Sequence, residues 1–338
     1  MSHDQPRVAV LGAGEWGRNH VRTWHSLGVL AMVCDPDPGR REEVRGFGVE
    51  VVADTSAVIG RDDIDVVVVA TPVPTHHDLA IAAMRAGHDV LVEKPLAMDL
   101  AGAEEVVRVA EETGTVLAVG HVLEYHPAVR RLDSLLREGA LGELLWMTSH
   151  RLSLGQVRTA EDVLWSFAPH DIAMLLRLTG RPPELVTGRR RAFVTAGVAD
   201  VAFCGLTFPG GVEGQIVTSW LHPFKEHRLV VVGREAMAVF DDTKPSAEKL
   251  LLQPYVVEHR QDGHPPTSLK GDPIAVEIDD VLPLTEECRH FLHRVADRQR
   301  PLTDGRSALD VLRVLAAADR SAAEGGAPVA PEPSQVFG

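Results

Sequence analysis

A glycine-rich turn directly after a short apolar run constrains the fold of this chain more than any other feature. Residues 7–17 read RVAVLGAGEWG, so a predicted strand runs into the pattern G-x-G-x-x-G, and a helical pattern follows it. Gly12 permits the tight turn, Gly14 lets a pyrophosphate approach the backbone, and Gly17 lets the helix pack on the strand. The pattern predicts a dinucleotide-binding unit, and a plain strand-to-helix turn is the alternative.

Asp35 stands at the end of the next predicted strand. Its carboxylate can accept hydrogen bonds from the hydroxyl groups of an adenosine ribose, and its charge would repel a 2′-phosphate. We therefore predict NAD as the cofactor, with NADP less favoured. Arg40 and Arg41 lie close by in the sequence and could favour NADP, or they could be solvated residues at a helix start. Asp35 itself could instead cap a helix or close a turn beside Pro36.

Residues 7–122 alternate short apolar runs with helical patterns, which is typical of parallel strands joined by crossover helices. We predict strands at 7–12, 30–35, 65–70, 89–93 and 115–120. A helix is expected at 76–86, with Thr75 as its N-cap and Gly87 just past its end.

After residue 122 the pattern changes and strands dominate. Turns separate the predicted strands, which favours an antiparallel sheet. The strands are expected at 143–152, 201–208, 212–221, 228–232, 237–240 and 250–257. Helices are expected at 127–138, where Gly139 is the stop signal, and at 169–178, 285–297 and 307–323.

These patterns predict an α/β fold with two domains, because 338 residues exceed what one hydrophobic core usually supports. We expect an N-terminal Rossmann dinucleotide-binding domain and a C-terminal α/β domain with a large, mostly antiparallel open sheet. The predicted bounds are 1–122 for the Rossmann domain, 123–300 for the substrate and oligomerisation domain, 301–323 for a helix that packs back on the first domain, and 324–338 for a tail.

The composition limits the partners and the compartment of the chain. A formal net charge of −14 gives no electrostatic reason to bind nucleic acid or an anionic membrane. We find no pattern of a secretory signal and no apolar run long enough to span a bilayer. The three cysteines are far apart and odd in number, so we expect no disulfide framework and a cytoplasmic location.

Lys94 is the first candidate for proton transfer. It lies in Glu93-Lys94-Pro95, where a predicted parallel strand ends, and open α/β sheets bind their ligands at this edge. When a hydride leaves a carbinol carbon, the hydroxyl proton must leave too. A Lys with a lowered pKa can take that proton while Glu93 orients it. A surface Lys before a loop proline is the alternative.

His170 is the second candidate. It follows Pro169 at the predicted start of a helix, and imidazole titrates near neutrality, which suits proton transfer beside Lys94. A capping or packing histidine is the alternative. Asp171 could simply favour the N-terminus of the helix.

Other histidines could suggest a metal site, namely His76, His77, His121 and His126. Their positions match no recognisable ligand spacing. Hydride transfer to a nicotinamide needs no metal, so we predict none.

These motifs together resemble the Gfo/Idh/MocA family of sugar and cyclitol oxidoreductases, over nearly the full length of the chain. The resemblance rests on residues 12–17, 70–72 with 75–77, 93–95, and the stretch WSFAPHD at 165–171. Within the family, 120–121, 124–127, 151–155 and 301–305 most resemble the branch that acts on nucleotide-linked amino sugars, such as UDP-N-acetylglucosamine or its uronate, often at the C3 hydroxyl.

The resemblance implies a role for each matching residue. Lys94 and His170 would be the catalytic pair. The cofactor-binding residues would be Gly12, Gly14, Glu15, Trp16, Gly17, Asp35, Thr71, Pro72, His76, Glu93, Lys94 and His121. The substrate-binding residues would be Lys94, Tyr125, Arg151, Trp165 and His170. Arg130, Arg131 and Arg151 are candidates to meet a diphosphate, although the first two could be solvated surface residues.

One position departs from the family pattern. The family usually places an Asp four residues before the catalytic His, and this chain has Ser166 there. Ser supplies no negative charge, so an imidazolium at His170 would lose that partner. Asp171 need not replace it, because adjacent side chains on a helix point about 100° apart.

The sequence therefore predicts an NAD-dependent oxidoreductase that transfers hydride between a nicotinamide and a sugar carbon, in a homodimer or homotetramer formed through the C-terminal sheet. Three alternatives stay open. The chain could be a keto-sugar reductase or a free cyclitol dehydrogenase with the same residues. It could be a redox-neutral epimerase or lyase that holds its NAD tightly, as Ser166 could suggest. It could also be a non-catalytic NAD-binding regulator.

Overall fold

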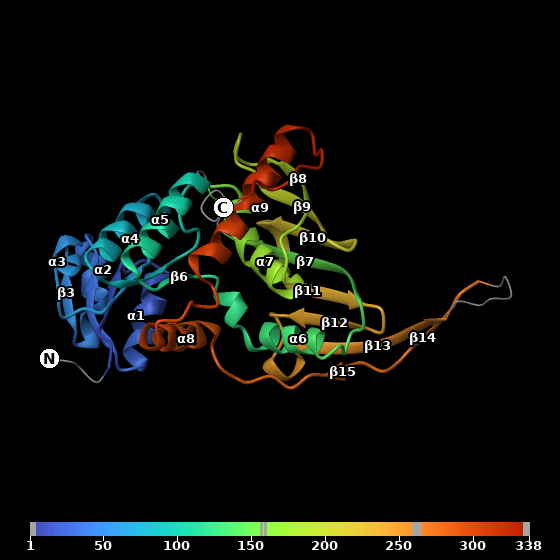
Figure 1. The fold of residues 1–338 in the computed structure, drawn as a ribbon, viewed down its shortest axis with the longest axis horizontal. Helices are drawn as coiled ribbons and strands as arrows, with labels where there is room; N and C mark the ends of the chain where they lie inside the picture. Colours follow the sequence, from blue (N-terminus) through green and yellow to red (C-terminus); the bar gives the residue numbers. More distant parts are fainter. Residues whose placement is uncertain (1–4, 156–157, 159–160, 259–264, 334–338) are drawn as a thin grey trace. The chain divides into compact units, whose positions relative to one another are not determined.

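The computed structural model describes residues 5–155, 158, 161–258 and 265–333. The described chain forms two compact units (Figure 1). One contains the residues up to Val122 and Leu282–Leu312, and the other contains Leu123–Val281 and Arg313–Pro333.

The first unit is built on a six-stranded parallel sheet with the order β3-β2-β1-β4-β5-β6. The strands are β1 (Val8–Leu11), β2 (Leu30–Cys34), β3 (Glu50–Val52), β4 (Val66–Val69), β5 (Asp89–Val92) and β6 (Leu117–Val119). β1 and β4 read VAVL and VVVV and are fully buried, as strands covered on both faces should be. The parallel sheet confirms the predicted N-terminal fold. β3 escaped prediction because it is only three residues long and partly exposed at the sheet edge.

Crossover helices connect these strands. They are α1 (Gly17–Ser26), α2 (Pro38–Val44), α3 (Ser56–Ile59), α4 (His76–Arg85) and α5 (Leu100–Thr113). Thr75 precedes α4, but its side chain makes no capping hydrogen bond. Thr75 does stand at the N-cap position, as predicted, but its hydroxyl donates to the Pro72 carbonyl within a short 3-10 turn instead of capping the helix. Gly87 has a φ of +96°, which agrees with a helix ending there.

Helix α8 (Pro283–Asp297) belongs to the first unit, although we predicted it in the second. Cys288 and Phe291 are fully buried in one cluster with Val10 and Trp24 of the N-terminal segment. Burial of these side chains outweighs proximity along the chain, and the predicted limit at residue 300 was therefore wrong. Helix α9 (Gly305–Ala323) begins in the first unit and ends in the second, so the prediction that it packs on the first domain holds only for its start.

The second unit contains a nine-stranded sheet in which β10 pairs in parallel with β7 and the remaining pairs are antiparallel. The strands are β7 (Leu144–Leu154), β8 (Leu185–Arg191), β9 (Val201–Phe208), β10 (Val212–Ser219), β11 (Leu221–Gly233), β12 (Ala236–Asp241), β13 (Leu250–Glu258), β14 (Thr267–Lys270) and β15 (Ile274–Ala275). This sheet confirms the predicted mostly antiparallel architecture. The polar strand β8 and the short strands β14 and β15 escaped prediction.

Helices α6 (Pro127–Arg137), α7 (Val163–Thr179) and the end of α9 complete the second unit. Gly188 of β8 lies so close to α9 that an added Cβ would stand 2.1 Å from the Ala318 carbonyl oxygen. This contact requires glycine and fixes α9 on the sheet.

Helix α7 starts earlier than predicted. Its N-cap is Asp162, whose carboxylate accepts a hydrogen bond from the Trp165 amide, so Pro169 lies inside the helix rather than at its start. Proline is favoured at a first helical position, which misled the prediction. Inside α7 it removes one backbone hydrogen bond. The helix persists around Pro169 because its apolar side chains are buried on both sides of that residue, as at Leu164 and Ile172. His170 and Asp171 therefore lie in the middle of α7.

Candidate active site

The glycine-rich turn between β1 and α1 has the geometry of a nucleotide-binding loop. Gly12 has a φ of +95°, and an added Cβ would lie 2.5 Å from the Ala70 carbonyl oxygen. At Gly17 an added Cβ would lie 2.1 Å from the Gly12 carbonyl oxygen, so close packing requires both glycines. At Gly14 the only atom of the described residues within 4 Å of an added Cβ is Arg40 Nη1, at 3.9 Å. Protein packing does not require glycine there, whereas a closely approaching pyrophosphate would, so the loop fits a dinucleotide.

Asp35 is buried beside this loop. Its Oδ2 accepts a hydrogen bond of 2.7 Å from the Ala13 amide, and its Oδ1 accepts one of 2.9 Å from the Asp37 amide. Asp35 thus closes a turn, while Asp37 is the residue that caps α2. Each carboxylate oxygen can accept a second hydrogen bond, which leaves capacity for a ribose hydroxyl.

The two arginines considered as NADP determinants have different environments. Arg41 Nη1 donates to the carbonyl oxygens of Asp35 and Pro36, both at 2.8 Å, so its guanidinium stabilises the turn. Arg40 is half exposed, and its Nη1 lies 3.7 Å from Asp35 Oδ2 and close to Gly14. Arg40 is therefore the one of these two that borders the nucleotide loop.

Glu93 connects the nucleotide loop with Lys94. Its buried carboxylate accepts hydrogen bonds from Trp16 Nε1 in the loop and from the Lys94 amide, and it lies 2.7 Å from His20 Nε2 of α1. Burial raises the pKa of Glu93, but the hydrogen bond and charge of His20, the Trp16 donor and the charge of Lys94 hold it below its usual range. Glu93 is therefore an ionised group that joins three separate segments.

His20 was missed by the sequence analysis. It lies on the buried face of α1 with Gly17, Val21 and Trp24, which follow helical spacing. The histidine in the middle of that apolar face could have indicated a buried polar contact from the sequence alone, because a buried polar side chain needs a polar partner.

His76 and His121 lie near the same Glu-Lys-Pro segment. The ring nitrogens of His76 contact the carbonyl oxygens of Pro95 and Thr71, each at 2.8 Å, which holds the Thr71-Pro72 segment beside it. Burial and the charge of Lys94 lower the pKa of His121 to about 4, against the opposing effect of Glu93. His121 is therefore neutral at pH 7, and a second cation does not form beside Lys94.

In the second unit, Asp171 forms a buried ion pair with Arg151 of β7. Arg151 Nε and Nη2 donate to its two carboxylate oxygens at 2.6 and 3.1 Å, and the Ser149 hydroxyl donates at 2.6 Å. Burial and the charges of Arg151 and Lys225 lower the pKa of nearby His227 to about 4. The hydrogen bonds of the Asp171 carboxylate therefore go to two residues of β7, Ser149 and Arg151. They also occupy two of the donors on Arg151, which is a predicted substrate residue.

Trp165 is held by a second polar cluster. Its Nε1 donates to Asp319 of α9 at 2.9 Å, and Arg190 of β8 bridges Asp319 and Asp162 at 2.7 and 2.6 Å. These contacts link the start of α7 to α9 and β8, and they fix the indole of a predicted substrate residue.

The remaining predicted residues are spread over the second unit. Tyr125 is buried in a 3-10 turn (Val122–Tyr125) before α6. Arg131 pairs with Glu138 at the surface of α6, which favours the solvated reading for this residue. Ser166 is buried one turn before His170 on α7.

The described residues contain no group of three His, Cys, Asp or Glu side chains that could hold a metal ion. They also contain no helix that is long and apolar enough to cross a membrane. Cys34, Cys204 and Cys288 are buried free thiols.

Comparisons with known proteins agree with this geometry. Residues 6–121 match the model of the oxidoreductase family with an NAD-binding Rossmann fold, GFO/IDH/MocA, and residues 129–239 match the C-terminal domain of the same family. The UDP-N-acetylglucosamine 3-dehydrogenase of Acidithiobacillus ferrooxidans is 29% identical over 314 residues, which cover 92% of this chain and 95% of that protein. Its solved structure superposes with a TM-score of 0.81 at 26% identity, covering 94% of this chain and 98% of that chain.

An inositol 2-dehydrogenase of Streptomyces avermitilis is 34% identical over 215 residues, which cover 60% of this chain and 63% of that protein. The chain belongs to the GFO/IDH/MocA oxidoreductase family. It is an NAD-binding oxidoreductase of the sugar and cyclitol dehydrogenase type, and its substrate carries a CH–OH group.

Proposed function

We propose that this protein is an NAD-dependent dehydrogenase that oxidises the C3 hydroxyl of a nucleotide-linked amino sugar. The observation that carries the proposal is the position of Glu93, which bonds Trp16 of the nucleotide loop and directly precedes Lys94. The likeness to a UDP-N-acetylglucosamine 3-dehydrogenase over almost the whole chain supports this substrate class.

In this reaction the neutral form of Lys94 accepts the hydroxyl proton and becomes the ammonium cation. The glycine-rich loop would hold NAD, which would supply the hydride acceptor for the same carbon, so loss of the hydride and of the hydroxyl proton would convert the alcohol to a ketone. Glu93 orients Lys94, and His170 exchanges the proton with Lys94. Tyr125, Arg151 and Trp165 bind the sugar, while Asp35 holds the adenosine ribose of NAD. Gly12, Gly14, Glu15, Trp16, Gly17, Thr71, Pro72, His76 and His121 complete the proposed cofactor site.

The substrate and cofactor are tested together by following absorbance at the reduced-nicotinamide band. Purified protein is given NAD or NADP with a panel of nucleotide sugars, free sugars and cyclitols. We expect NADH to form with a UDP-linked amino sugar, and NADP to be the poorer oxidant because of Asp35. Turnover of free inositol alone would favour the cyclitol dehydrogenase alternative, which the Streptomyces relative supports. If no compound of the panel gives NADH although the protein binds NAD, the result would favour ketone reduction or redox-neutral chemistry.

Replacing Ser166 with aspartate should change the pH dependence of kcat/KM. In the Ser166→Asp variant, a carboxylate one helical turn before His170 favours the imidazolium. The pH profile of kcat/KM should then shift upward by about one unit in its His-dependent limb. Ser166→Asn, which adds similar bulk without charge, is the control. Superimposable profiles for the two variants would contradict a proton-transfer role for His170.

A second copy of this chain is the proposed partner of the open sheet face in the second unit. Trp146, Leu185 and Phe203 are between 41% and 44% exposed, and the strand registers place all three on one face. Phe203→Glu should reduce the mass measured by light scattering to that of a monomer, because a charge there opposes burial. Met98→Glu, at an exposed apolar residue of the first unit, is the control. An unchanged mass for Phe203→Glu would place the interface elsewhere.

A cytoplasmic location stays a prediction.

A further inference from the structure

His20 is a fully buried histidine on α1 that the packing of this helix does not require. It lies on the apolar face with Val21 and Trp24, where an apolar side chain would pack at lower cost. Its Nε2 lies 2.7 Å from Glu93 Oε1, and its Nδ1 is buried without a hydrogen-bond partner among the described residues. Because a carboxylate only accepts hydrogen bonds, Nε2 carries a proton and donates to Glu93. Glu93 is the only hydrogen-bond partner of this side chain in the described part of the chain.

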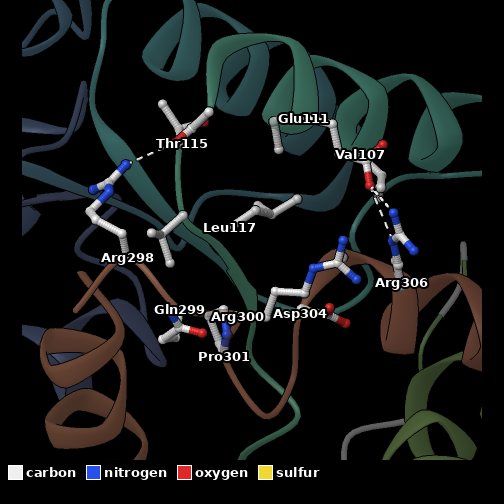
Figure 2. Close-up of a pocket in the computed structure, with 14 residues that line it drawn as sticks. Val107, Glu111, Thr115, Leu117, Arg298, Gln299, Arg300, Pro301, Asp304 and Arg306 are labelled. Atoms are coloured by element: carbon white, nitrogen blue, oxygen red, sulfur yellow. Dashed lines mark hydrogen bonds and ion pairs between the residues drawn. The ribbon is translucent and has the colours of Figure 1, made fainter. Parts of the chain in front are cut away.

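Other charged pairs of the first unit hold the chain to itself, as in a pocket of about 390 Å³ beside the segment 298–306 (Figure 2). There Arg306 pairs with Glu111 of α5. Arg298 pairs with Asp89 of β5. Both pairs fasten that segment to its neighbours, so they are structural. The contact of the buried histidine differs, because the carboxylate that it meets also bonds the glycine-rich turn.

The same oxygen of Glu93 meets two side chains from the first turn of α1. Trp16 Nε1 donates to Oε1, and His20 Nε2 is the second donor to this atom. Trp16 and His20 stand one helical turn apart, and the His20 amide donates to the Trp16 carbonyl at 3.3 Å. In dinucleotide-binding folds the amides of this turn face the pyrophosphate. Since Trp16 is 43% exposed, the buried histidine is the firmer of the two connections.

The other oxygen of Glu93 is held as well. The Lys94 amide donates to Oε2 at 3.2 Å. At Gly120 an added Cβ would lie 2.8 Å from Oε2, so the position of the carboxylate requires glycine there. Glu93 is therefore a fixed point from which His20 can hold α1.

The charge of Glu93 depends strongly on His20. Burial raises the pKa of the Glu93 carboxyl, and the largest opposing effect is the hydrogen bond from His20, followed by its charge and, more weakly, by that of Lys94. His121 and Cys288 also interact with Glu93. Burial lowers the pKa of His121 to about 4 and raises that of the Cys288 thiol well above its usual value, so both are uncharged near pH 7.

We propose that His20 is a positioning residue for the cofactor, which acts through Glu93 to hold the first turn of α1, with Trp16, in the arrangement that binds NAD. The inference rests on the cofactor site proposed above, in which Trp16 and Glu93 border NAD. His20 itself needs no contact with the cofactor. Without its hydrogen bond the pKa of the buried carboxyl should rise, and a protonated carboxyl group accepts hydrogen bonds less strongly than a carboxylate.

The test is calorimetric titration of NAD into the full chain at about pH 8 and at about pH 6. His20→Ala should raise the Kd for NAD about tenfold at the higher pH. Its Kd should rise further at the lower pH, because the higher pKa of Glu93 leaves more of this group protonated as the pH falls. In the unchanged protein Glu93 stays ionised at both pH values and adds no such dependence.

His20→Gln is the conservative variant. Its side-chain amide can donate to Glu93 but does not titrate, so it should restore most of the affinity for NAD and remove the added pH dependence. If His20→Ala does not fold, His20→Leu takes its place, because leucine fills the apolar face of α1 without a donor.

His88→Ala is the matched control for the loss of a buried imidazole in the same unit. The ring nitrogens of His88 lie 2.9 Å from the carbonyl oxygens of Ile64 and Ile59, so its contacts do not involve Glu93. This variant should leave the Kd for NAD unchanged at both pH values.

Glu93→Gln distinguishes action through the carboxylate from a general loss of stability. When His20→Ala is added to Glu93→Gln, the Kd for NAD should change by less than about twofold, because the group through which His20 acts is already gone. An unchanged Kd in His20→Ala overturns the proposal. An equal loss in His88→Ala, or an equal effect of His20→Ala with and without the carboxylate, also overturns it.

These titrations need no sugar substrate, so they are independent of the dehydrogenase assay. The expected Kd values together with no turnover of any nucleotide sugar would reject the proposed substrate and leave the role of His20 standing. Turnover of a nucleotide sugar with an unchanged Kd in His20→Ala would reject only the role of His20.

Discussion

The Lys94→Ala variant is expected to lose at least about 100-fold in kcat while its affinity for NAD stays near that of the unchanged protein. Removing the group that accepts the hydroxyl proton takes general-base catalysis from the chemical step. The glycine-rich turn and Asp35 keep their own contacts in this variant, so NAD binding should persist. The measurements are steady-state kinetics with the active substrate of the panel and a direct titration with NAD.

Lys94→Arg separates proton transfer from electrostatics. Arginine keeps the positive charge but does not give up its proton in proteins, so this variant should be almost as impaired as Lys94→Ala. Activity restored by arginine would mean that Lys94 only polarises the substrate oxygen. Near-normal kcat in Lys94→Ala, with unchanged NAD affinity, would remove Lys94 from the mechanism altogether. His170→Ala tests the second proposed member in the same assay.

The second large effect is expected on stability, at the buried pair of Arg151 and Asp171. Only 11% of the arginine side chain and 1% of the aspartate side chain are exposed. Asp171→Asn leaves the guanidinium without its buried counter-charge, which should lower the free energy of unfolding by about 3–5 kcal/mol. Urea denaturation followed by circular dichroism measures this loss, provided that the transition is two-state.

A double-mutant cycle shows whether the pair itself carries this stability. In Asp171→Asn with Arg151→Met no lone charge remains, so the double variant should be clearly more stable than the sum of the single effects implies. Arg131→Met removes an exposed pair with Glu138 and should cost less than about 1 kcal/mol. If Asp171→Asn costs no more than Arg131→Met, the pair is not a structural element of the second unit.

The ion pair of Arg151 and Asp171 also bears on whether Asp171 can replace the carboxylate that is missing at Ser166. Asp171 follows His170 directly, yet its carboxylate is occupied by Arg151 and Ser149 of β7. It therefore serves the packing of α7 on the sheet, and it does not supply the negative charge that the family usually places at position 166. The pH profile of Ser166→Asp is informative for this reason.

Local patterns predicted the nucleotide half of the fold well. The glycine-rich turn is recognised from a few adjacent residues, and the central strands are buried on both faces, which leaves a plain apolar pattern in the sequence. Elements with little apolar signal were missed, as at β3, β8 and β14. The start of α7 was misplaced because Pro169 was assigned to the first helical position that proline favours. The buried apolar side chains on both sides of Pro169 were not weighed against that preference.

By itself the sequence determined the Rossmann unit, the open antiparallel sheet, and the family with its Glu93-Lys94-Pro95 segment, because each depends on short-range patterns. Only the tertiary structure decided which distant polar groups meet. Glu93 and His20 are 73 residues apart and Arg151 and Asp171 are 20 apart, and no periodicity predicts either pair. It also decided that α8 joins the first unit, because the gain from burying Cys288 and Phe291 depends on the three-dimensional arrangement of side chains and not on their order along the chain.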